Sequence, residues 1–267
     1  MSLCVSVALW FVVVGSAAAQ APVVNAKVDR QPAPQSIARE VQAIADRGGA
    51  GWVGYRVPMI RAASAPMRIG ETCCGRCRLE PPTELVVLAR VEAGRLVELR
   101  PVSVDCDIDA AGMTLVWFES VDPDDSIRWL ESIAANASGR SATRLADAAL
   151  VALAQHAASG AAPVLVRFAR DGATAHLRGQ SLVWLARRAA AQAVPAITAA
   201  IDQDPETEVK RRAVFALFQM PRDESIPRLI DLARSHRNLE VRRQAFLYLG
   251  QSNDPRALAF FSDILLQ

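Results

Sequence analysis

Residues 209–217, VKRRAVFAL, decide the fold, because residues 241–249, VRRQAFLYL, repeat their pattern at a shift of 32. Two earlier units extend this alignment without a gap. Apolar residues at helical spacing form one stripe on each helix, and a helix pair that is apolar on several sides must stack against its neighbours. The repeat therefore predicts an α-solenoid of four units over residues 145–267. The main columns are Leu145, Leu177, Val209 and Val241; Leu150, Leu182, Val214 and Phe246; and Leu153, Leu185, Leu217 and Leu249.

Each unit also predicts a second helix. In the second unit its stripe is Val194, Ile197 and Ile201. Pro195 is expected in the first turn of that helix, where a missing N–H costs nothing. Upstream, residues 122–144 predict a capping helix from Pro123 to Asn136 and a linker, with Asp122 as the N-cap.

These repeats resemble the HEAT family, in particular the HEAT-like repeats also found in bilin lyases. The residues that carry the resemblance are 209–217 and Asp254-Pro255-Arg256-Ala257-Leu258. The ending at Gln251–Leu258 is also similar to that of a group of exported bacterial HEAT-repeat proteins. The resemblance implies a protein partner held on the second helices, which line the concave face in HEAT folds. The candidate contacts are Arg167, Arg170, Arg228, Asp231 and Arg234, and the alternative is an ordinary solvated face.

The N-terminus predicts export. Residues 5–14, VSVALWFVVV, are followed by small residues ending at Ala19, which is the pattern of a cleaved signal peptide over residues 1–19. No Lys or Arg precedes the apolar run, so an uncleaved membrane anchor is the alternative. Both readings place the remaining chain outside the cytoplasm, either periplasmic or secreted, and contact with a membrane is expected only if the segment stays attached.

Between these regions, we expect an extended lead-in over residues 20–34 and a small α+β module over residues 35–121. A short helix capped by Ser36 precedes strand-like runs, two of which meet at the tight turn Ala93-Gly94. An antiparallel sheet of this size has a marginal core of its own. The predicted fold class is therefore mainly α, with a HEAT-like α-solenoid preceded by a small antiparallel β module.

Four cysteines remain after the signal: Cys73, Cys74, Cys77 and Cys106. Their even number in an exported chain favours two structural disulfides. A Cys73–Cys74 bond is disfavoured by geometry, which leaves two pairings open. A zinc site and a redox-active pair activated by nearby arginines are the alternatives.

Composition and motifs offer little support for other functions. The net charge is +2, too small for a nucleic-acid binder. His156, His176 and His236 are not followed by Glu, unlike the His-Glu pairs of iron-binding HEAT-type hydroxylases. The acids from Asp105 to Asp109 begin like a calcium loop, but the later positions fail. We therefore expect neither cofactor nor metal.

A column of cations, Arg178, Lys210 and Arg242, runs through successive repeats. We interpret it as a structural ladder with acids such as Glu208 and Glu240, and the alternative is a binding surface. Taken together, the sequence predicts an exported, non-catalytic scaffold that binds another protein. The alternative function is a thiol-redox or metal-binding protein centred on the cysteine cluster.

Overall fold

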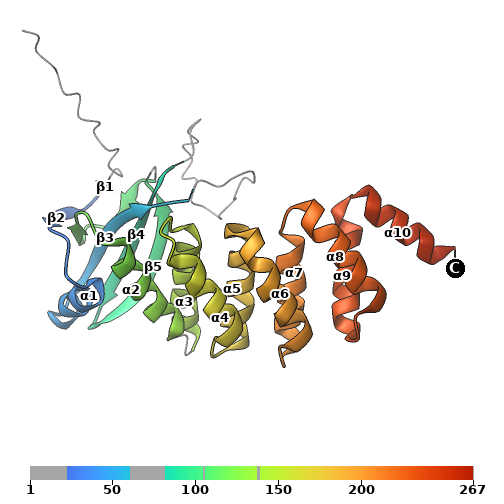
Figure 1. The fold of residues 1–267 in the computed structure, drawn as a ribbon. Coiled ribbons are helices and arrows are strands. Elements are labelled where there is room, and N and C mark those ends of the chain that lie inside the picture. The colour runs from blue at the N-terminus through green and yellow to red at the C-terminus, as the bar shows by residue number, and fades with distance from the viewer. Residues whose placement is uncertain (1–22, 61–81, 105, 137–138, 267) are drawn as a thin grey trace, which may run out of the picture.

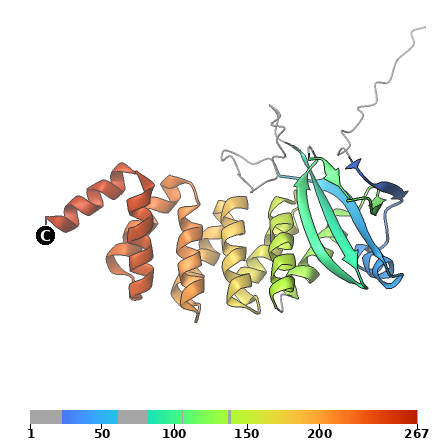
Figure 2. The same ribbon diagram turned by 180° about the vertical axis from the view of Figure 1, so that it is seen from behind.

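The computed structural model describes residues 23–60, 82–104, 106–136 and 139–266. A β-sheet lies at one end, and helix pairs follow one another in line away from it, with the C-terminus at the far end (Figures 1 and 2). The predicted fold class is confirmed: the chain is mainly helical, with a repeat region behind a small sheet.

The main sheet has five strands in the order β2-β7-β3-β4-β5. Strands β3, β4 and β5 are antiparallel, as expected, whereas β7 pairs in parallel with both β2 and β3. The expectation of a purely antiparallel sheet was therefore wrong for β7, because both of its parallel pairs join it to strands far earlier in the chain. The strands are β1 (Val23–Val24), β2 (Lys27–Gln31), β3 (Ala50–Pro58), β4 (Glu84–Glu92), β5 (Arg95–Ser103), β6 (Ile108–Asp109) and β7 (Thr114–Phe118), and β1 pairs with β6 in a separate small sheet.

One face of the main sheet packs against α1 (Ile37–Asp46), α2 (Pro123–Ala135) and the first repeat. Its buried residues belong to the same apolar cluster as the core of the helical repeats. Buried hydrogen bonds tie the layers together: the hydroxyl groups of Tyr55 and Ser126 lie 2.9 Å apart, and the N–H of Ile37 donates to Asp125 at 2.7 Å. The repeats thus complete the core that the small sheet lacks by itself.

The end of β3 runs beside the end of the first repeat helix. Met59 forms an antiparallel bridge with His156, and the N–H of Ile60 donates to the carbonyl of Gln155 at 2.9 Å. His156 is fully buried, and burial together with the Arg188 guanidinium lowers the pKa of His156 to about 4. Its ring therefore stays neutral at pH 7 and serves to pack the junction.

The repeats form four helix pairs, α3/α4 to α9/α10. The small-residue column Ala149, Ser181, Ala213 and Ala245 is fully buried, so paired helices approach closely there, as its residue types suggest. Helix α3 begins at Arg140, earlier than the predicted start at residue 145. The helices are α3 (Arg140–Gln155), α4 (Ala161–Asp171), α5 (Ala175–Arg188), α6 (Ala190–Gln203), α7 (Thr207–Phe218), α8 (Arg222–Ser235), α9 (Leu239–Ser252) and α10 (Pro255–Leu265).

The expected place of Pro195 was wrong. Helix α6 begins at Ala190, so Pro195 lies inside the helix rather than in its first turn, and Pro227 lies inside α8 in the same way. The apolar stripe alone did not reveal the additional turn before each proline. Across the described residues, no helix is both long enough and apolar enough to span a membrane.

Candidate interaction surface

Two grooves separate the second helices of the repeats. The first lies between α4 and α6 and has a volume of about 610 Å³. The second lies between α6 and α8 and has a volume of about 330 Å³. Helix α6 forms a wall of both, and its exposed side carries small residues such as Ala199, so neither groove is filled from that side.

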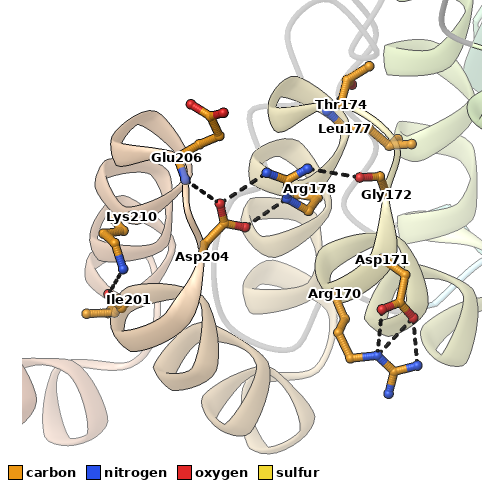
Figure 3. A network of polar contacts seen from close by, with 10 residues as sticks. All are labelled: Arg170, Asp171, Gly172, Thr174, Leu177, Arg178, Ile201, Asp204, Glu206 and Lys210. Atoms are coloured by element: carbon orange, nitrogen blue, oxygen red, sulfur yellow. Dashed lines mark hydrogen bonds and ion pairs between the residues drawn. The ribbon is translucent and has the colours of Figure 1, made fainter.

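Ion pairs within the chain compensate the charges of the α4–α6 groove (Figure 3). Arg178 binds both carboxylate oxygens of Asp204, with Nε–Oδ2 at 2.8 Å and Nη2–Oδ1 at 3.0 Å. Burial alone would raise the pKa of Asp204, but the hydrogen bonds from Arg178 and from the N–H of Glu206 outweigh burial and lower it. Arg170 pairs in the same way with Asp171, Nη2 to Oδ2 at 2.7 Å.

The cation column caps helix ends. Arg178 donates to the carbonyl of Gly172 at 3.0 Å, Lys210 to that of Ile201 at 2.7 Å, and Arg242 to that of His236 at 2.7 Å. Each cation satisfies carbonyl groups left free where a second helix ends. These contacts support the structural interpretation of the column.

The predicted partners of this column were wrong, however. Glu208 binds Arg211 and Arg212, and Glu240 binds Arg243, all on the same helix as the acid. Helical neighbours three and four residues apart lie on the same face, which favours these pairs over contact with a cation two residues away.

The α6–α8 groove combines an apolar floor with a polar rim. Ile197, Ile201 and Leu217 are buried beneath it. Asp202 stands on the α6 side and Asp231 on the α8 side. Asp202 approaches Nε2 of His236 at 3.5 Å. The remaining rim and wall residues are Val194, Thr198, Arg228, Leu232 and Ser235.

The structure divides the five predicted contact residues. Arg228 and Asp231 meet in the α6–α8 groove, Arg170 lines the α4–α6 groove, and Arg167 and Arg234 line neither of these two. All four arginines form ion pairs within the chain: Arg167 with Glu131, Arg170 with Asp171, Arg228 with Glu224, and Arg234 with Asp263. Asp231 is the member of this set whose side chain has no ion pair or hydrogen bond among the described residues.

Sequence reasoning missed Asp202 and the grooves themselves. A signal existed, because Asp202 and Asp231 occupy the repeat positions of Arg170 and Arg167, respectively. The first of these columns reads Arg167, Ala199, Asp231 and Asp263, whereas the second alternates as Arg170, Asp202 and Arg234, so the acids stand together only beside the α6–α8 groove.

The cysteine site is only partly visible. Cys106 is buried and disulfide-bonded. Cys73, Cys74 and Cys77 lie outside the described residues, so the pairing and the role of the cluster stay predictions.

The acids that begin like a calcium loop are also only partly described, because Asp105 lies outside the described residues. Asp109 uses its Oδ1 to accept from Asn25 and from the N–H of Ala111. Within the described ranges, His, Cys, Asp and Glu side chains form no group of three that could hold a metal ion.

Comparison with known proteins bears on the repeat region. No curated protein matches the chain. Among solved structures, the crystal structure of an engineered protein is similar at 19% identity and a TM-score of 0.30, over 54% of this chain and 63% of that one. Residues 194–267 match the family model of HEAT repeats. That match supports HEAT repeats over residues 194–267, and the helix pairs before residue 194 continue the same stacking in line.

Proposed function

We propose that this protein is an exported, non-catalytic scaffold that binds another protein through the second helices of its HEAT repeats. The observation that carries the proposal is the pair of grooves on the two sides of α6. Repeat stacking fixes the walls of both grooves, so a partner meets a surface already formed and loses little free energy to ordering it.

The export part of the proposal rests on residues 1–19, which lie outside the described residues. If the signal is cleaved before Gln20, the mature protein begins at that residue. Cell fractionation and the intact mass of the purified native protein test this step, and a full-length mass in the cytoplasmic fraction would contradict export.

Site-specific crosslinking tests the binding surface. A photo-crosslinking residue in place of Thr198 or Ala199 sits in the α6–α8 or the α4–α6 groove, respectively. The control position is Arg211, which is exposed on the first helix α7. We expect a discrete crosslinked product in the native compartment from at least one groove position and none from Arg211. Equal crosslinking from all three positions would reject the second helices as the binding surface.

The thiol-redox or metal-binding alternative has no support from the described residues. The one described cysteine, Cys106, is 2% exposed. Thiolate exchange requires an accessible sulfur, so the observation weighs against a role for Cys106 as an attacking thiol.

A further inference from the structure

The α6–α8 groove carries acidic charge that the chain leaves uncompensated. The Asp231 side chain is exposed on α8 and has neither an ion pair nor a hydrogen bond within the described ranges. Two cations of α8, Arg228 and Arg234, lie three residues from Asp231. Arg228 binds Glu224, with Nη1 at 2.8 Å from Oε2, and Nη2 of Arg234 lies 3.6 Å from Oδ2 of Asp263. The Asp231 carboxylate therefore faces the groove without a cation of α8 bound to it.

Asp202 adds a second carboxylate on the opposite wall. Its Oδ1 lies 3.5 Å from Nε2 of His236, whose Nδ1 accepts the N–H of Asn238 at 3.1 Å. Arg237 lies close by, but its Nη2 donates to the main-chain carbonyl of Asp202 at 2.8 Å. The Asp202 carboxylate itself forms no ion pair with Arg237.

The floor between the two acids is apolar. Ile197 and Ile201 of α6 and Leu217 of α7 are buried below the groove, whereas Val194 and Leu232 on its walls stay partly exposed. An apolar side chain inserted here removes further apolar surface from water, which favours binding. The groove thus offers an apolar anchor site flanked by two negative charges.

We propose that the α6–α8 groove binds a segment of a partner protein that inserts an apolar side chain between α6 and α8 and places Lys or Arg against Asp202 and Asp231. The inference rests on the proposed scaffold function and names the chemistry of its partner. Charge complementarity selects a basic segment, because an acidic one would meet two like charges. The α4–α6 groove gives no such preference, since its acids and arginines pair with one another.

Synthetic peptides provide the probe. One fluorescent peptide alternates leucine and lysine, a second replaces lysine with glutamate, and a third replaces leucine with serine. Fluorescence anisotropy with the purified full-length protein is expected to show saturable binding of the leucine–lysine peptide, and at least tenfold weaker binding of the other two. Equal affinity for the lysine and glutamate peptides would overturn the proposal.

Variants locate the binding. Asp231→Asn is expected to lower the affinity for the leucine–lysine peptide by up to about fivefold, because an exposed ion pair contributes little free energy. Asp231→Lys is expected to reverse the preference toward the glutamate peptide. The matched control is Glu40→Gln, which removes one negative charge from α1 at the far end of the molecule (Figure 1). It is expected to leave both affinities unchanged, and an equal loss in this control would show a general charge effect and overturn the proposal.

A second variant separates the groove from its charge. Thr198→Trp places a bulky, uncharged side chain from an exposed position into the groove and is expected to abolish binding of the leucine–lysine peptide. If it does so while Asp231→Lys changes nothing, the groove binds without charge selection and the inference fails, although the scaffold function stands. If crosslinking at Thr198 and Ala199 also fails, the scaffold function itself is rejected. Self-association of the protein through this groove, measured by light scattering, would likewise overturn the basic-segment proposal.

Discussion

The grooves on the two sides of α6 are built from the same repeat columns but differ in charge. On the α4 side, Arg178 and Asp204 compensate each other, and both are largely withdrawn from solvent. One repeat further on, their positions hold Lys210 and His236, and Lys210 turns to the carbonyl of Ile201 instead. The comparison teaches that a repeat can keep its stacking while exchanging an internal ion pair for an open acidic rim.

The largest effect on stability is expected in the apolar core that the repeats on both sides of α6 share. Leu217 is 2% exposed and lies in the column that runs through every repeat. Leu217→Ala should lower the free energy of unfolding by about 2–5 kcal/mol, because it leaves a cavity between packed helices. Urea denaturation measures this loss. Stability equal to that of a surface variant such as Arg228→Ala would show that the deduced repeat register is wrong.

A smaller loss of stability is expected when the Arg178–Asp204 ion pair on the α4 side of α6 is removed. Arg178→Met should cost about 1–3 kcal/mol at pH 7, because Asp204 then loses two hydrogen bonds in a largely buried place.

The dependence of that loss on pH follows from the Asp204 carboxyl. Its folded pKa lies below the ordinary value, so its contribution to stability is complete above about pH 4 and is lost as the pH falls through the folded pKa. The difference in the free energy of unfolding between Arg178→Met and the unaltered protein should therefore become smaller when urea denaturation is repeated at about pH 3. A gap that widens in acid would contradict the role given to Asp204.

On the α8 side the charges should matter little for stability. Arg228 and Glu224 form an exposed pair within one helix, four residues apart. Arg228→Ala should change the free energy of unfolding by less than about 0.5 kcal/mol, which thermal or urea denaturation can resolve. A loss of several kcal/mol would mean that this side depends on its charges as the α4 side does.

The smallest effect is expected for the unpaired acid. Asp231→Asn removes a charge that forms no ion pair among the described residues, so its free energy of unfolding should stay within about 0.3 kcal/mol of that of the unaltered protein. Differential scanning calorimetry of the two proteins checks this. A clear destabilisation would reveal a structural role for Asp231 and weaken its assignment to partner binding.

Two polar residues of the α6–α8 groove could be predicted from the sequence, but the sign of the charge on its surface could not. Arg228 and Asp231 were singled out because they avoid the apolar stripe of a second helix, and the structure places both in one groove. The arginines gave the expected surface a basic character. Glu131 and Asp263, which neutralise Arg167 and Arg234, come from neighbouring helices, and no local pattern reveals such pairs.

In the sheet, too, local strand pairs could be predicted from the sequence and distant pairs could not. The hairpin of β4 and β5 follows from a local turn at Ala93-Gly94 and was predictable. The parallel pairing of Lys27 with Thr114 depends on strands brought together only when the whole module folds.

By itself, the sequence determined the repeat, its length and the faces that its helices bury, because apolar spacing along a helix fixes which side must leave water. Only the tertiary structure decided which charges remain free, because an ion pair depends on distances of a few ångströms between side chains on different helices. The stretch at residues 209–217 therefore establishes the array, whereas the acidic groove beside it depends on how the repeats are spaced.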